Sequence, residues 1–233
     1  MSTLLLRLAA PLQAWGVDSK FDTRTTAREP TKSGVIGLLA AALGIRRDDI
    51  AALKALSALR FGVRVEREGK YLNDFHMVHE EEFWKKREGK YSHVTHRYYL
   101  SDAVFLCGLE HPDRRVLERY AYALTHPVFP LFLGRRSCPP TLPLVLGIRD
   151  EKLLDVLRTE PRCDGADGAM RIVYEVEPED RTAAAVKDVP ESFSPFRREY
   201  GYRKIRETII GQQTEHDPFA ELEAEDVSDE NGA

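Results

Sequence analysis

The stretch Thr3-Leu4-Leu5-Leu6-Arg7-Leu8-Ala9 sets the first expectation for the fold of this chain. Its length and leucine content are typical of a buried strand, and Pro11 ends it. Residues 12–30 are polar and rich in Arg, Thr and Asp, which predicts a long exposed loop. The next segment, residues 31–45, has its apolar positions on one helical face, and Thr31 or Ser33 can cap the helix that it predicts.

Helices and strands alternate along the rest of the chain. Helices are predicted at about 31–45, 48–59, 113–124 and 152–158, and strands at 61–67, 95–109, 143–148 and 170–176. In residues 61–67 apolar and charged side chains alternate, as in a half-buried strand. Residues 73–95 are too long and too charged for a turn and predict a protruding arm. The order strand, helix, strand, strand, helix, strand is that of the ferredoxin-like split βαβ unit, so we predict an α+β fold.

Composition divides the chain into three parts. Residues 1–160 form the predicted ferredoxin-like core, and residues 160–169 are rich in Gly, Asp and Pro, which indicates a linker. A small β-rich C-terminal subdomain is predicted over 161–212, with a strand at 170–176 and a basic segment at 197–206. Residues 213–233 are predicted to be an acidic, disordered tail.

Bulk properties exclude several classes of protein. Hydrophobic residues make up 42% of the chain, which is enough for a substantial core. No apolar stretch reaches the roughly 18–20 residues of a membrane helix, and the N-terminus lacks the pattern of a secretory signal. The three cysteines are widely spaced and do not indicate a disulfide framework. We therefore expect a cytoplasmic protein without membrane contact.

The net charge of −4 conceals an uneven distribution. From Glu215 onward the sequence has eight acidic residues and no Lys or Arg. Removing these eight from the 38 acidic residues leaves 30 against 34 basic ones, so residues 1–214 carry +4. The acidic end is either a solubilising terminus or a segment that blocks misplaced RNA.

Three clusters could bind an anion. At the first, Lys32, Ser33 and Gly34 stand at a predicted helix N-terminus, which is a ready phosphate site. Gln13-Ala14-Trp15-Gly16 and the basic residues of the following loop, among them Arg24 and Arg28, accompany it. Alternatively, Ser33 only caps the helix, Lys32 is solvated and Trp15 packs in the core.

The second cluster is Leu133-Gly134-Arg135-Arg136-Ser137-Cys138-Pro139-Pro140. A glycine and two prolines predict a rigid turn, and the planar forks of Arg135 and Arg136 suit phosphates. The alternative is a loop with solvated arginines. A further basic segment, residues 197–206, could line a groove or face another subunit.

The third cluster is the arm, where aromatic and basic side chains interleave as in single-strand RNA binding. They are Trp84, Lys85, Lys86, Arg87, Lys90, Tyr91, Arg97, Tyr98 and Tyr99. An arm that contacts protein is equally compatible with this pattern.

Two patterns of side chains are typical of enzymes. His76, His79, His93 and His96 are spaced as paired metal ligands, but no Cys partners or helical zinc motif accompany them, so no metal or other cofactor is predicted. His93 or His96 with Lys90 and Tyr91 could assemble general acid–base cleavage of RNA. The spacing alone does not decide for or against this reaction.

Taken in order, three segments resemble a known family. They are residues 5–16 (Leu-Leu-Arg-Leu to Pro-Leu-Gln-Ala-Trp-Gly), residues 28–40 (Arg-Glu-Pro-Thr-Lys-Ser-Gly-Val-Ile-Gly-Leu-Leu-Ala) and residues 134–140 (Gly-Arg-Arg-Ser-Cys-Pro-Pro). Together they resemble the CasD family of type I-E Cascade, from residue 1 to about residue 210.

The resemblance implies an RRM-like ferredoxin core with a projecting thumb at about 73–97. It implies a non-catalytic subunit that binds the 5′ handle of CRISPR RNA (crRNA). The resemblance also implies that this subunit caps the filament of CasC backbone subunits and contacts the large subunit CasA. Target DNA would be bound only indirectly, within the complex. The expected RNA-binding residues are Gln13, Trp15, Arg24, Arg28, Lys32, Ser33, Gly34, Arg97, Arg135 and Arg136. The expected thumb and subunit contacts are Trp84, Lys85, Lys86, Arg87 and Tyr91. A related subfamily cleaves CRISPR RNA, so an endoribonuclease is the alternative, and an assembly adaptor that never touches RNA is a third possibility.

Overall fold

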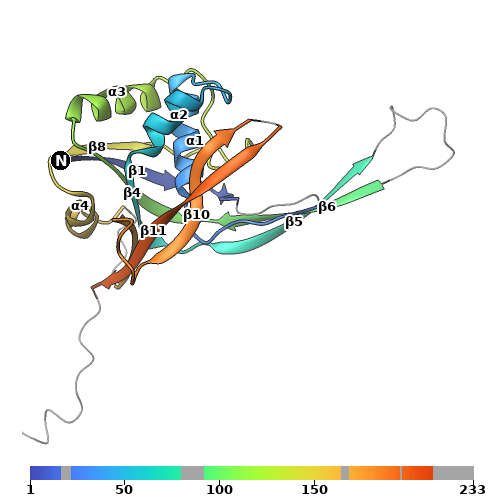
Figure 1. Cartoon of the computed structure of the whole chain (residues 1–233). Helices are drawn as coiled ribbons and strands as arrows, with labels where there is room; N and C mark the ends of the chain where they lie inside the picture. Colours follow the sequence, from blue (N-terminus) through green and yellow to red (C-terminus); the bar gives the residue numbers. More distant parts are fainter. Residues whose placement is uncertain (17–21, 80–91, 164–167, 195, 212–233) are drawn as a thin grey trace, which may run out of the picture.

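A central antiparallel sheet organises the computed structural model, which describes residues 1–16, 22–79, 92–163, 168–194 and 196–211, the side chains of 78, 79, 92 and 93 excepted. Within these residues, its strands lie in the order β10-β11-β9-β4-β7-β1-β8 (Figure 1). Their bounds are β1 Ser2–Ala9, β4 Arg60–Arg67, β7 Val104–His111, β8 Val145–Arg149, β9 Met170–Val176, β10 Ala184–Phe193 and β11 Arg198–Ile210. The sheet joins segments from both ends of the chain.

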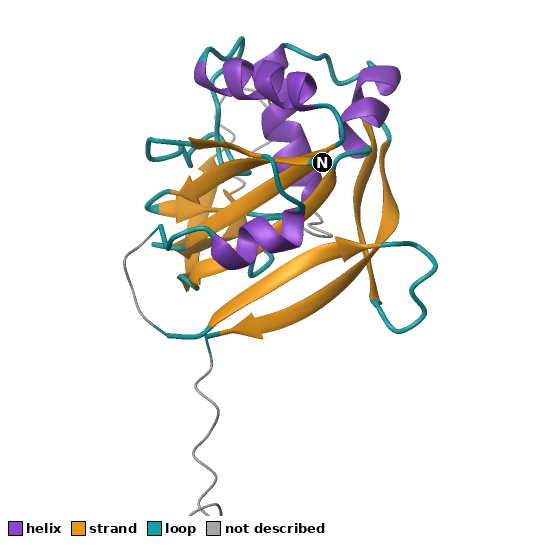
Figure 2. Ribbon diagram, turned by 90° about the vertical axis from the view of Figure 1, so that its left-hand side faces the viewer, coloured by secondary structure: helices purple, strands orange, loops and turns teal. Residues whose placement is uncertain are grey.

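Helices cover both faces of this sheet (Figure 2). They are α1 Lys32–Leu43, α2 Ile50–Ser57, α3 Arg114–Thr125 and α4 Leu153–Thr159, which confirms the four predicted helices. At the start of α1 the hydroxyl of Thr31 accepts a hydrogen bond from the Gly34 N–H at 3.2 Å, so Thr31 is the cap. The mixed α/β class is confirmed.

The apolar run of β1 serves two cores. Leu4, Leu6 and Leu8 point into the larger core with α1 and α3, whereas Leu5 belongs to a second cluster with Leu153 and other residues of α4. A strand with only one covered face would alternate apolar and polar residues. The continuous leucine run of the sequence therefore reflects burial on both faces.

The strand β4 departs from the half-buried pattern that its charges predicted. Arg64 and Glu66 are 0% and 4% exposed, and the Arg64 Nε donates to Glu66 Oε1 at 2.7 Å. The same guanidinium donates to the carbonyls of Leu157, Glu160 and Pro161 at 2.6–3.0 Å. The end of α4 and the start of the predicted linker cover this face, so a buried charged pair replaces the expected exposed one.

A second, smaller sheet forms the base and shaft of an arm. Its strands are β2 Leu12–Gln13, β3 Thr23–Arg24, β5 Lys70–His79 and β6 Ser92–Ser101. β5 pairs with β6 in continuous register from Lys70 opposite Ser101 to His79 opposite Ser92, and the pair projects from the body (Figure 1). β2 and β3 add to the other edge of β6. The segment 12–30, predicted as a long exposed loop, therefore contributes two strands.

The C-terminal segment continues the main sheet. β9 pairs with β4 and with β11, and β11 pairs with β10. β10 was not among the strands predicted from the sequence. The segment 161–212, predicted as a small subdomain, thus shares a ladder of hydrogen bonds with the N-terminal core, while residues 213–233 lie outside the described residues.

Candidate nucleic-acid interface

The Gln13-Ala14-Trp15-Gly16 segment lies largely inside the molecule. Gln13 and Trp15 are 0% and 1% exposed. The Gln13 Nε2 donates to the Ala103 carbonyl at 2.7 Å, and the Gln13 Oε1 accepts from the Trp15 Nε1 at 3.2 Å. A Cβ at Gly34 would lie 2.8 Å from the Trp15 Cε3, so glycine there lets α1 approach the indole. These side chains therefore hold the segment in the core, and the expected contact of Gln13 and Trp15 with RNA stays a prediction.

The N-terminus of α1 already binds a carboxylate of the chain itself. The Lys32 N–H donates to Asp188 Oδ2 at 2.8 Å. Arg203 donates to both oxygens of the same carboxylate at 2.6 and 2.9 Å. Because a helix N-terminus attracts an anion, Asp188 of β10 occupies the position that the sequence predicted for a phosphate.

The side chain of Lys32 is also engaged. It is 2% exposed, and its Nζ lies 3.0 and 2.8 Å from the two carboxylate oxygens of Glu175. Burial lowers the pKa of Lys32, and the attraction of Glu175 opposes that shift. Lys32 therefore forms a buried ion pair that joins α1 to β9, and its expected contact with RNA stays a prediction. Ser33 is 9% exposed.

The turn at Gly134 contacts the glutamine–tryptophan segment. The Ala14 N–H donates to the Leu133 carbonyl at 3.1 Å, and the Leu133 N–H donates to the Cys138 carbonyl at 2.7 Å. Gly134 has φ of 85°, and a Cβ there would lie 1.5 Å from the Ala14 carbonyl oxygen. Two segments far apart in the sequence thus meet where only glycine fits.

Arg135 links this turn to the base of the arm. Its Nη1 donates to the Tyr98 carbonyl at 3.0 Å, and its Nη2 donates to the Arg24 carbonyl at 2.9 Å. Its guanidinium carbon also lies 4.5 Å from the centre of the Tyr99 ring. The half-buried Arg135 therefore holds β3 and β6 in place, and its guanidinium already donates to two carbonyls of the chain.

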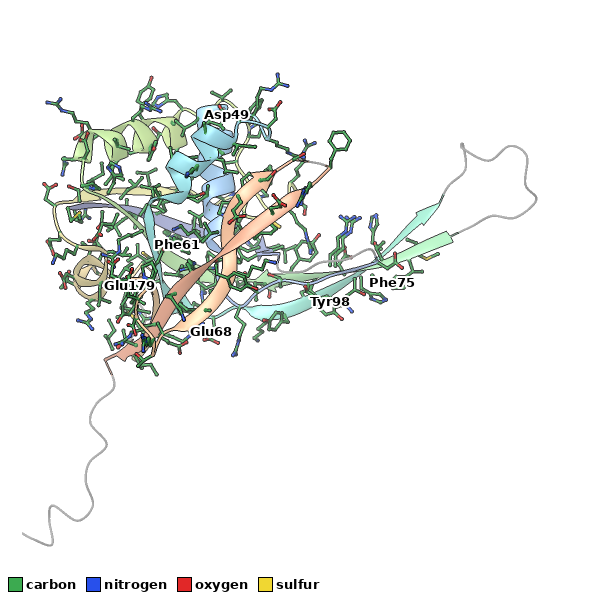
Figure 3. All side chains as sticks on the ribbon, viewed as in Figure 1. Asp49, Phe61, Glu68, Phe75, Tyr98 and Glu179 are labelled. Atoms are coloured by element: carbon green, nitrogen blue, oxygen red, sulfur yellow. The ribbon has the colours of Figure 1, made fainter. Side chains whose placement is uncertain are left out.

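Other predicted cations lie around the arm base. Arg24 is exposed on β3, and the exposed Arg28 lies 3.6 Å from Glu68. Arg97 of β6 is half-buried, and its Nε has no hydrogen-bond partner. Phe75 and Tyr98 lie along the arm itself (Figure 3). The predicted thumb residues Trp84, Lys85, Lys86, Arg87 and Tyr91 lie outside the described residues.

The histidines of the arm are only partly described. His76 is exposed, and the ring of His96 packs edge-on against Phe75 with centroids 5.7 Å apart. The side chains of His79 and His93 lie outside the description, as do Lys90 and Tyr91. Among the described residues no group of three or more potential metal ligands occurs. The zinc and ribonuclease patterns remain hypotheses.

A cleft of about 1250 Å³ lies beside α1, lined by residues of α1, of segment 129–139 and of the hairpin β10–β11. Four arginines line it, here called the cleft arginines: Arg46, Arg47, Arg136 and Arg198. Its aromatic lining residues are Phe129, Phe132, Phe193, Phe196 and Tyr200. Ser33, Gly34 and Arg136, three of the predicted site residues, share this cleft.

The cleft carries a net positive charge. Asp48 is the one acidic residue in its lining, and it lies 3.3 Å from Arg46 in an exposed pair. Arg47, Arg136 and Arg198 have no ion-pair partner within the described part of the chain. Four arginines and one aspartate give the lining a charge of +3. Guanidinium groups beside aromatic rings can bind phosphates and stack on bases.

About half of the residues that line this cleft were not predicted from the sequence. Arg198 and Tyr200 belong to the segment that we expected to line a groove or face a subunit. Arg46-Arg47 and Phe129-Pro130-Leu131-Phe132 were not predicted as site residues. Their signal was a basic pair just after the helix-ending Gly44, and an apolar run that two prolines keep out of a helix.

These features define an α/β protein with a long two-stranded arm and a cationic, aromatic cleft suited to a polyanion. The chain belongs to the CRISPR-associated protein (Cas_Cas5) family, whose model matches residues 3–206. It is 41% identical over 159 residues to the CRISPR system Cascade subunit CasD of Escherichia coli (strain K12), which covers 63% of this chain and 70% of that protein. The resemblance to the CasD family is thereby confirmed.

Two solved structures share the fold. A chain of a CRISPR RNA-guided surveillance complex superposes with a TM-score of 0.74 and 34% identity, covering 89% of each chain. A structure described as the crystal structure of a Cas protein superposes with a TM-score of 0.69 and 39% identity, covering 90% of this chain and 95% of that one. None of the helices in the described residues is long and apolar enough to span a membrane.

Proposed function

We propose that this protein is a non-catalytic subunit of a type I-E Cascade complex that binds the 5′ handle of CRISPR RNA and caps the filament of backbone subunits. The observation that carries the proposal is the cleft. It presents Arg47, Arg136 and Arg198 without acidic partners in the described residues, next to exposed aromatic rings. Single-stranded RNA is bound by this combination of charge and stacking surface.

The two neighbouring arginines of the turn support a continuous RNA path. Arg136 lines the cleft, while Arg135 bonds to the carbonyls of Tyr98 and Arg24 at the arm base. A strand of RNA that leaves the cleft across this turn meets Arg24 and Arg97 next. We propose direct contacts for the exposed or half-buried Arg24, Arg28, Arg97 and Arg136, and contacts with Ser33 and Gly34 along the wall of the cleft.

In this proposal the remaining predicted residues hold neighbouring elements in place and do not contact RNA themselves. Lys32, Arg135, Gln13 and Trp15 hold α1, the turn and the arm base in place through the buried contacts described above. The unit β1, α1, β4, β7, α3 and β8 is proposed to be the ferredoxin-like, RRM-like core, and β5–β6 the thumb. We propose contacts with CasC and CasA, an indirect association with target DNA, and a cytoplasmic location.

The test removes three positive charges from the cleft and compares the effect on RNA retention with that of removing three positive charges elsewhere on the surface. The cleft variant is Arg47→Ala, Arg136→Ala and Arg198→Ala. The control variant is Arg115→Ala, Arg158→Ala and Arg181→Ala, three exposed arginines that do not line the cleft. Each complex is reconstituted with a handle-bearing guide RNA, and RNA retention is measured against salt concentration.

The cleft variant should lose RNA while the control retains it. Because each lost phosphate contact on single-stranded RNA reduces the salt slope by about 0.7, the slope of the cleft variant should fall by about 2. Equal retention by the two variants would refute the cleft as the RNA site. Handle nucleotides that become protected only when this chain is present would support the proposal independently.

The same reagents address the alternative functions. Specific cleavage of an unprocessed repeat RNA by the purified chain, lost in His93→Ala with His96→Ala, would establish an endoribonuclease instead. A chain that joins the complex but never crosslinks to guide RNA would be an assembly adaptor.

A further inference from the structure

We infer that the acidic tail of this chain, residues 213–233, binds in the cleft when RNA is absent and is displaced when RNA enters. The inference rests on the proposed function only for the identity of the competitor. Occupation of the cleft by the tail follows from the charges of the two segments and from the length of chain available.

The charges of the two segments are complementary. The cleft lining carries +3, and three of its arginines have no acidic partner among the described residues. The tail has eight acidic residues and no basic one from Glu215 onward. The rest of the chain, residues 1–214, carries +4, so the negative net charge of this protein comes from the tail. Carboxylates can form paired hydrogen bonds with arginine.

Reach divides the tail into two halves. Arg198 begins β11 at the cleft, and Ile210 ends that strand at its far end (Figure 1). Thirteen residues of strand span about 40 Å at ~3.3 Å per residue. An extended chain of ~3.3–3.6 Å per residue needs about 11–12 residues to return that distance. Acidic residues from Glu221 onward can therefore reach the cleft, whereas Glu215 and Asp217 cannot.

The contact is expected to be weak and reversible. Exposed ion pairs are individually weak and are screened by salt. Attachment to the same chain gives the tail an effective concentration in the millimolar range, which makes weak binding sufficient. A guide RNA with several phosphates and stacking bases displaces such a segment, whereas short or non-cognate RNA competes poorly. The tail thereby raises the selectivity of the cleft.

The experiment uses the full-length chain and two matched tail variants. The distal variant is Glu225→Gln and Asp226→Asn. The proximal variant is Glu215→Gln and Asp217→Asn. Both raise the net charge by two, so a general electrostatic effect is equal in the two. Affinity for an oligouridylate of about eight nucleotides is measured at about 50 mM salt and again at about 0.5 M.

The distal variant should bind the oligouridylate about five-fold more tightly than the native chain at low salt, and the proximal variant less than about two-fold. The difference should vanish at high salt. A second measurement needs no RNA. A photo-crosslinking amino acid in place of Val227 should crosslink to peptides that contain Arg47, Arg136 or Arg198, and one in place of Phe219 should not.

The outcomes separate this inference from the proposed function. Absence of a crosslink from position 227 to the cleft overturns the inference, and so do equal effects of the two variants on an RNA that does bind there. A second outcome is a crosslink to the cleft together with an RNA affinity that neither the tail variants nor the loss of the cleft arginines changes. That outcome supports binding of the tail in the cleft and refutes the cleft as the RNA site.

Discussion

The substitution Gly134→Ala is expected to separate the turn at Gly134 from the segment at Ala14. Gly134 has φ of 85°, and an added Cβ would lie 1.5 Å from the Ala14 carbonyl oxygen. An ordinary contact needs about 3.4 Å or more, so the two backbones must move apart by about 2 Å.

That movement has a cost that can be worked from the contacts. Alanine at a positive φ costs about 1–2 kcal/mol. Separation breaks the hydrogen bond from the Ala14 N–H to the Leu133 carbonyl, at 3.1 Å. A buried donor left without a partner costs about 1–3 kcal/mol more. The free energy of unfolding should therefore fall by about 2–5 kcal/mol.

Urea unfolding, followed by circular dichroism, measures this change against a matched control. Gly168 has φ of 107°, and a Cβ there would meet nothing within 4 Å. Gly168→Ala therefore carries the conformational cost without the clash and should cost only about 1–2 kcal/mol. If the two variants lose the same stability, the close approach at Ala14 is not what requires glycine at position 134.

Three further predictions follow from individual side chains. Arg135→Ala should lower the free energy of unfolding by about 2 kcal/mol, because it removes two hydrogen bonds to carbonyls and the contact with the Tyr99 ring. Arg136 is exposed, so Arg136→Ala should change the free energy of unfolding by less than about 0.5 kcal/mol. Urea unfolding measures both changes. Burial lowers the pKa of Lys32 in the folded chain below its ordinary value of 10.5. Between the folded-state pKa and 10.5 the unfolded chain binds more protons than the folded chain. The contribution of Lys32 to the free energy of unfolding therefore rises with pH in that interval. Lys32→Met should remove this rise from the free energy of unfolding, measured with urea at a series of pH values below 10.5, and an unchanged pH dependence would contradict the burial of Lys32. Burial, aided by the Glu66 carboxylate, raises the pKa of Cys163 from 9.0 to about 11. Its alkylation at about pH 8, followed by mass spectrometry, should then be about 100-fold slower than that of an ordinary thiol, and a rate equal to that of a model thiol would contradict this shift.

Local sequence signals predicted the regular elements well. Each of the four helices begins within two residues of its predicted start, because apolar periodicity and capping residues are local properties. The strand 170–176 is confirmed with both ends as predicted. Arg64 and Glu66 were placed on an exposed face because their alternation with apolar residues carries no information about what covers that face.

The candidate site was harder to predict than the fold. Trp15 and Lys32, which were expected to bind RNA, are both buried. The Trp15 indole donates to Gln13, and the Lys32 ammonium group pairs with Glu175. Their residue types suit RNA binding, but the partners that engage them lie on other elements. The cleft instead brings Arg47, Arg136 and Arg198 together from segments separated by tens of residues.

The sequence by itself determined the family, the helices, most of the strands and the concentration of acidic residues after Glu215, because these depend on residue order and local periodicity. The tertiary structure decided which cations are free to bind. Asp188 and Glu175 reach the start of α1 only because β9, β10 and β11 extend the central sheet past it. Whether a charged side chain can meet a phosphate depends on which counter-charge the fold has already brought to it.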